Sequence, residues 1–238
     1  MAKPTRRTFL AGAAAGVVTP GILASGVSAS EPQLVWKTSD WKVAEFQKIV
    51  MHPARVKQVY DVKPINDGMF LNNVKNSLDG LHFGFGVPEN QIKIVAALHG
   101  PSNMLNYDDY VWKKYKIGEW FKVTDPTTGQ PAERNIYYPA VSRPAGEKAI
   151  EDPNDGRSIY QAKTIQDLQS RGVQFLSCHT ATEEQAKMLV HRLQLSVASE
   201  DVVKEMLAHT IPGAMVVASM VAAIALLQAE GRYTYITV

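Results

Sequence analysis

From about residue 53 onward, short apolar runs alternate with amphipathic stretches along most of the chain. Five segments predict strands, because they are rich in β-branched residues and either alternate with polar positions or are apolar throughout. These segments are 55–62, 91–98, 173–178, 213–218 and 233–238. A helical spacing of apolar residues predicts helices at 72–83, 158–171, 182–193, 201–209 and 219–229. The alternation predicts an α/β protein, a three-layer α/β/α sandwich over a mainly parallel sheet of about five strands.

Two segments do not follow this alternation. Residues 30–52 are polar and have no clear period, which predicts an N-terminal arm held by aromatic side chains. Residues 118–157 are rich in Pro, Gly and Asp and are too long for an ordinary connection. We expect them to form a surface insertion within a single domain that spans 53–238.

The first 29 residues have the pattern of an export signal. Arg6 and Arg7 precede a weakly apolar stretch of small residues at 11–27, and small residues continue to Ala29. A cationic start, an apolar centre and a small-residue end indicate a cleaved signal peptide, and adjacent arginines indicate the twin-arginine route. An uncleaved membrane anchor is the alternative, but Pro20 and the interspersed glycines disfavour a spanning helix. We expect a periplasmic protein cleaved near Ala29.

Composition narrows the function classes. The chain has 238 residues, of which 45% are hydrophobic and 20% charged, so it is neither disordered nor fibrous. Its single cysteine excludes an internal disulfide and a four-cysteine zinc site. Of its 25 Lys and Arg residues, three lie in residues 1–29, which leaves 22 basic against 23 acidic residues. A near-neutral body without a basic run gives no electrostatic footprint for nucleic acid.

An uncharged stretch at 211–227 raises the question of a membrane span. Pro212 and Gly213 interrupt it, and its two halves predict a buried strand and a helix. We therefore expect no membrane span in the mature chain.

Three phrases in this order of elements resemble the DsrE/DsrF-like family of small α/β proteins. They are IVAALHGP at 94–101, LQSRGVQFLSC at 168–178, and VVASMVAAI followed by LQAEGRYTYI between 216 and 236. The resemblance covers about 53–117 and 158–238. It implies a five-stranded parallel sheet, assembly into homo-oligomers such as trimers or hexamers, and sulfur relay as a persulfide on one cysteine. Two features depart from the family: Met220 stands where many members have Gly, and sulfur-relaying members usually work in the cytoplasm.

Candidate chemistry lies where strands end, because ligands in open α/β sheets gather at the carboxyl ends of strands. His99 lies at the end of the second predicted strand, and Cys178 and His179 lie at the end of the third. If those strands are neighbours, the three side chains share one crevice. A helix N-terminus and an imidazolium both favour the thiolate form of a cysteine. In this scheme Cys178 accepts sulfur, His99 or His179 is its proton partner, and backbone amides at 180–183 hold the persulfide.

Three functions stay open at this point. The first is an exported sulfur carrier or sulfurtransferase without a bound cofactor, whose partner is a small sulfur compound or a sulfur-relay protein. The second is a non-catalytic oligomeric binding protein in which Cys178 is only a small buried hydrophobe. The third is a periplasmic metal-binding module, since thiolate and imidazole at Cys178, His99 and His179 suit copper or zinc.

Overall fold

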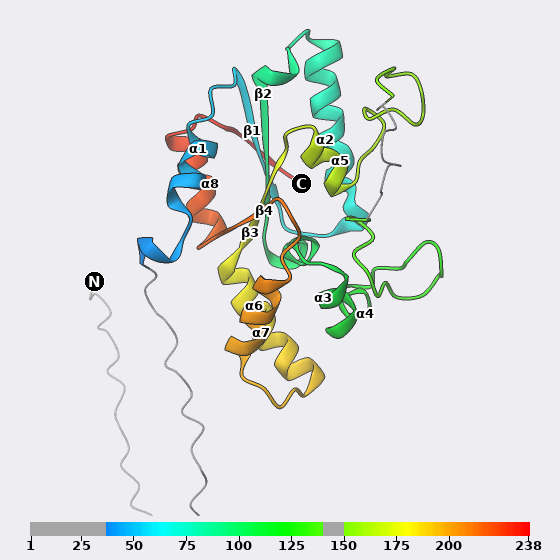
Figure 1. Ribbon diagram of the computed structural model, residues 1–238, viewed down its shortest axis with the longest axis vertical. Helices are drawn as coiled ribbons and strands as arrows, with labels where there is room; N and C mark the ends of the chain where they lie inside the picture. The colour runs from blue at the N-terminus through cyan, green and yellow to red at the C-terminus, as the bar shows by residue number, and fades with distance from the viewer. Residues whose placement is uncertain (1–36, 140–149) are drawn as a thin grey trace, which may run out of the picture. The chain divides into compact units, whose positions relative to one another are not determined.

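A five-stranded sheet forms the centre of the computed structural model, which describes residues 37–139 and 150–238 (Figure 1). All neighbouring strands are parallel and lie in the order β4-β3-β2-β1-β5. The strands are β1 (Val56–Val62), β2 (Ile92–Leu98), β3 (Gln174–Cys178), β4 (Ala214–Val217) and β5 (Thr234–Thr237). The predicted α/β class and five parallel strands are confirmed. The proposed signal peptide, residues 1–29, lies outside the described residues.

Helices cover both faces of the sheet. They are α1 (Val43–Val50), α2 (Met69–Asp79), α3 (Asp109–Lys114), α4 (Ile117–Phe121), α5 (Ile165–Ser170), α6 (His179–Leu193), α7 (Ser199–Ala208) and α8 (Met220–Ala229). Buried side chains of α2, α5 and α7, and those of α6 beyond its first turn, belong to one apolar cluster, and those of α1 and α8 to a second cluster. Figure 1 shows α1 and α8 together on one side of the strands and α2 and α5 on the other. The three-layer arrangement follows from this division.

The alternation of side chains along β2 explains why its buried stretch, residues 94–98, is apolar throughout. In β2, Ile94, Ala96 and Leu98 join the first cluster, while Val95 and Ala97 join the second. Successive side chains of a strand point to opposite faces, so a strand covered on both faces needs apolar residues at every position. Each fully buried aliphatic side chain stabilises the fold by about 1.5–3 kcal/mol.

Several helix boundaries differ from the prediction. The predicted helix at 158–171 is wrong in its first half: α5 starts at Ile165, after Thr164 caps it with a hydrogen bond to the Asp167 N–H. The helix predicted from 182 begins three residues earlier, so Thr182 lies inside α6 and does not cap it. Residues 43–50 of the predicted arm form α1, whose Ile49 and Val50 are buried against the sheet.

The segment after α4 packs onto the core. Gly118 lies so close to the backbone of Ala132 that a Cβ atom built on it would be 2.3 Å from the Ala132 carbonyl oxygen. An antiparallel bridge joins Thr124 to Pro131, and Val123, Ala132 and Tyr137 belong to the first apolar cluster. The described residues at 118–139 of the expected surface insertion are thus anchored to the domain.

A carboxylate on α7 joins that helix to α3. Glu205 accepts hydrogen bonds from the Lys114 ammonium and the Tyr110 hydroxyl, and from the Tyr115 hydroxyl at 2.9 Å. Burial alone would raise the pKa of Glu205, but these three donors outweigh it and lower the pKa to about 2. The group is therefore ionised across the physiological range of pH.

Candidate functional site

The helices that follow the neighbouring strands β3 and β4 cover opposite faces of the sheet. The buried side chains of α6, the helix after β3, belong mostly to the first apolar cluster, with those of α2 and α5, whereas those of α8, the helix after β4, belong to the second cluster on the opposite face, with those of α1. In open parallel sheets, ligands bind outside the carboxyl ends of the strands at such a reversal. Cys178 is the last residue of β3 and lies at this point.

The sulfur of Cys178 accepts a hydrogen bond from a backbone amide of each of these two helices. The Ala181 N–H, in the first turn of α6, donates to Sγ at 3.5 Å, and the Met220 N–H, at the start of α8, donates at 3.4 Å. Amides in a first helical turn have no intrahelical acceptor and carry the positive end of the helix dipole. Sγ therefore occupies a position that suits a negative charge. One of these donors falls within the expected 180–183 segment; Met220 does not.

Apolar side chains enclose the same sulfur. Cys178 is 5% exposed and belongs to the second apolar cluster, with Leu176 of its own strand and Val95 and Val217 of the neighbouring strands. A small molecule reaches the sulfur only if some of these neighbours move.

Asn103, in the turn after β2, holds the backbone of Cys178. The Asn103 side chain is fully buried, and its Oδ1 accepts the Cys178 N–H at 2.9 Å and the Ser177 hydroxyl at 3.1 Å. Its Nδ2 lies 3.2 Å from Thr182 Oγ1. The ladder between β2 and β3 ends at Leu98 and Ser177. The Asn103 carboxamide thus replaces strand pairing where the two strands separate.

His99 directly follows β2, and its backbone still pairs with β1 through an N–H bond of 3.2 Å to Val62 O. Side-chain alternation places His99 on the face of Val95 and Ala97, which is also the face of Cys178. The strands that carry His99 and Cys178 are neighbours, as the crevice hypothesis requires. The imidazole, however, turns toward β1, and no hydrogen bond joins it to the sulfur among the described residues.

Asp61, near the end of β1, binds His99. Its Oδ1 lies 2.5 Å from His99 Nε2, and its Oδ2 accepts the hydroxyl of Tyr235 on β5. The Lys63 ammonium lies 4.0 Å away. The hydrogen bond to Asp61, together with burial, raises the pKa of Tyr235. Asp61 is only 4% exposed, and these partners offset the cost of burying its charge.

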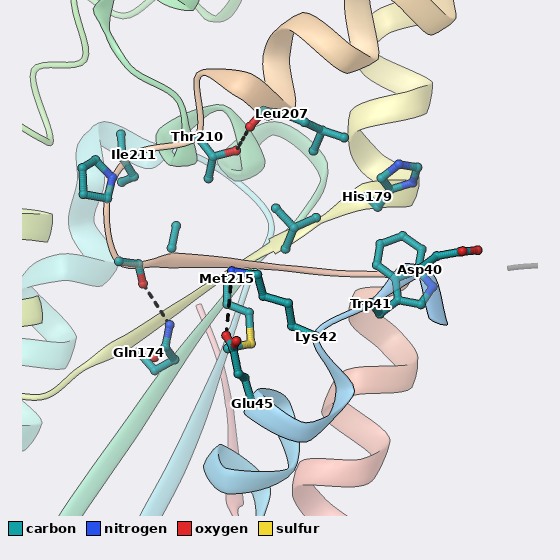
Figure 2. A pocket seen from close by; sticks show the side chains of 14 residues that line it. Asp40, Trp41, Lys42, Glu45, Gln174, His179, Leu207, Thr210, Ile211 and Met215 are labelled. Carbon is teal, nitrogen blue, oxygen red and sulfur yellow. Dashed lines mark hydrogen bonds and ion pairs between the residues drawn. The ribbon is translucent and has the colours of Figure 1, made fainter. Parts of the chain in front are cut away.

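His179, the first residue of α6, faces a different space. Its ring packs edge-on against Trp41 at 5.1 Å, and its Nδ1 lies 3.5 Å from Glu183 Oε1. Burial lowers the pKa of His179, and the Glu183 carboxylate partly opposes that shift. His179 and Trp41 line one end of a pocket of about 730 Å³ that runs along β4 (Figure 2). Cys178 and His99 do not line this pocket.

The structure thus places His99 and Cys178 on one face of the sheet, whereas His179 lines the pocket along β4. Within residues 37–139 and 150–238, no three His, Cys, Asp or Glu side chains are arranged to hold a metal ion, so the metal-binding alternative has no cluster at these residues.

Sequence reasoning missed Asp61 and Tyr235. A signal for Asp61 exists, because it is an acid on a strand whose other buried positions are apolar. Tyr235 has no local signal, since its role depends on β5 lying beside β1.

Comparisons with known protein families, with curated proteins and with solved structures find no match to this chain. In the part that the structure describes, no helix has the length and apolar character needed to cross a membrane. A proposal of function therefore rests on the fold and on the residues at the strand ends.

Proposed function

We propose that the protein is an exported sulfur carrier of the DsrE/DsrF-like type, in which Cys178 takes up one sulfane sulfur as a persulfide. The observation that carries this proposal is the pair of amides, from Ala181 and Met220, that donate to Sγ. Hydrogen bonds to an ionised acceptor are roughly twice as strong as neutral ones, so two amides aimed at one sulfur favour an anionic sulfur species.

The reaction needs a thiolate and a donor with a transferable sulfur, such as thiosulfate. The thiol proton of Cys178 passes to a histidine, and the thiolate attacks the outer sulfur of thiosulfate. The donor S–S bond breaks, sulfite leaves with the bonding electron pair, and the new S–S bond remains on Cys178. No external oxidant or reductant is required.

The burial of Cys178 fits a carrier that protects its cargo. A pocket of about 160 Å³ is lined in part by Val217, Ala218 and Ser219, which directly precede the donor residue Met220. We take this pocket as the entry for the sulfur donor. Closure over the sulfur excludes water and other nucleophiles from the persulfide.

Intact-mass spectrometry of the full chain after incubation with thiosulfate tests this function. We expect the wild-type protein to gain the mass of one sulfur atom and to lose it with a reductant, while Cys178→Ser gains none. A double variant, Cys178→Ser with Ser170→Cys, supplies an exposed thiol without the two amides. A wild-type chain that stays unloaded, or a displaced thiol that retains sulfur equally well, overturns the proposal.

The outer face of α8 favours a second candidate, an oligomeric binding protein without thiol chemistry. Val221 and Leu226 are 67% and 40% exposed, Ala222 and Ala225 lie exposed between them, and the exposed Ala229 follows. A helix that is apolar on all sides is normally buried. The face carries no charge, so it suits an equally uncharged partner face, and a second copy of α8 offers one.

A contact of α8 with its own copy relates two subunits by a two-fold axis. We expect an even number of subunits in light scattering, and dissociation in Leu226→Glu but not in Met188→Glu, which alters an exposed methionine on α6. A monomeric wild-type protein, or a Leu226→Glu variant that stays assembled, excludes this contact. A fully inert thiol in a stable oligomer would favour this candidate over the sulfur carrier.

A further inference from the structure

One side chain from each of four neighbouring strands forms a row across one face of the sheet. The row consists of Cys178 at the end of β3, His99 after β2, Asp61 on β1 and Tyr235 on β5. Asp61 and His99 follow the buried positions Val59 and Ala97 on that face, and Tyr235 pairs in register with Val59. Asp61 is already hydrogen-bonded to two of the other members, His99 and Tyr235.

The carboxylate determines which nitrogen of His99 carries hydrogen. An ionised carboxylate only accepts hydrogen bonds, so its contact with Nε2 places the hydrogen there and leaves Nδ1 as an acceptor. The two ring nitrogens point apart, so Nδ1 is directed away from Asp61 and β1. Nδ1 forms no hydrogen bond with another described residue, and the side chain is 15% exposed. The Tyr235 hydroxyl occupies the other carboxylate oxygen and fixes its orientation.

We propose that Asp61 and Tyr235 are positioning residues that hold His99 so that its Nδ1 accepts the thiol proton of Cys178. This inference rests on the proposed sulfur carrier and adds residues to it. The proton moves from Sγ to Nδ1, the electron pair stays on sulfur for the attack on the donor, and the Asp61 carboxylate stabilises the imidazolium that forms.

The transfer is indirect in this scheme, because no hydrogen bond joins the His99 imidazole to the Cys178 sulfur among the described residues. His99 and Cys178 directly follow Leu98 and Ser177, the last paired residues of β2 and β3, and neighbouring strands lie about 4.8 Å apart. One bridging water molecule, or the entering donor, completes the path, and catalytic hydrogen bonds commonly tighten only when substrate binds.

The test measures the alkylation rate of Cys178 by iodoacetamide in the full chain. We expect Asp61→Asn and His99→Gln each to lower the rate by about 10- to 100-fold, within the range of general-base contributions. The double variant should be no slower than His99→Gln alone, because Asp61 acts through His99. Tyr235→Phe should lower the rate by a smaller factor. Asp201→Asn, on an exposed acid of α7, is the matched control and should not change it.

A spectroscopic measurement keeps the proposal testable if Asp61→Asn folds poorly. The ¹⁵N shifts of His99 should show hydrogen on Nε2 in the wild-type protein and a mixture of tautomers in Tyr235→Phe. Hydrogen on Nδ1 in the wild type overturns the proposal, as do rates that are unaffected by Asp61→Asn or additive in the double variant. Sulfur loading with no dependence on Asp61 removes the positioning role alone. Dependence on Asp61 without sulfur loading removes the carrier and retains the positioning role.

Discussion

Replacement of Asn103 by leucine tests how the end of β3 is held. Leucine has a similar volume but removes the acceptor of two buried donors, the Cys178 N–H and the Ser177 hydroxyl. Each buried polar group left without a partner costs about 1–3 kcal/mol, so the loss in the free energy of unfolding should be about 2–6 kcal/mol. This is a large share of the roughly 5–15 kcal/mol that stabilises a typical domain.

Urea unfolding followed by tryptophan fluorescence measures this loss. Ser177→Ala is the graded control, because it removes one donor to Asn103 and leaves the Cys178 N–H paired; we expect a loss of about 1 kcal/mol. The alkylation rate of Cys178 should rise in Asn103→Leu, since the strand end is then less firmly closed. If Asn103→Leu costs no more than Ser177→Ala, the carboxamide does not hold the strand end and the reasoning fails.

Three further predictions concern other parts of the chain. Glu205→Gln should destabilise the protein at pH 7 and much less near pH 2. The lowered pKa of the Glu205 carboxyl group contributes stability that is complete above about pH 4.5 and is lost as the pH falls toward 2. Equal losses in the free energy of unfolding in urea at both pH values would contradict this. Gly118→Ala should lower the free energy of unfolding by about 1–3 kcal/mol through overpacking. Gly156→Ala should be nearly neutral in the same assay, because a Cβ atom built on Gly156 has no neighbour within 4 Å. Changing both Arg6 and Arg7 to lysine should leave the protein in the cytoplasm in cell fractionation, and unchanged export would argue against the twin-arginine route.

The strands could be predicted because short apolar runs in the sequence indicate their burial. β2 is apolar at almost every position, and burial on both faces of a parallel sheet requires such a run. Helix boundaries were less accessible. Cysteine is not a preferred N-cap residue, so Thr182 was the better candidate for the start of α6, although Cys178 occupies the cap. Helix α1 has only eight residues, too few for its period to be distinct from the polar sequence around it.

The candidate site was accessible from sequence only in part. Chain order alone brings His99 and Cys178 to the same edge, because both lie at the carboxyl ends of strands of one parallel sheet. The direction of the imidazole depends on Asp61, and the support of Asp61 depends on Tyr235, 174 residues away. No local pattern states that β5 returns to pair with β1, so this part of the site requires the three-dimensional structure.

That return of β5 has a consequence for folding order. Strand β1 emerges early during synthesis, but its second neighbour is made more than a hundred residues later. Pairing across so long a separation raises contact order and slows the closing step of folding. Until it occurs, Asp61 lacks its tyrosine partner, so a nascent or truncated chain contains Cys178 and His99 before Asp61 is held by Tyr235. The contact between Tyr235 and Asp61 therefore forms late, after most of the chain has left the ribosome.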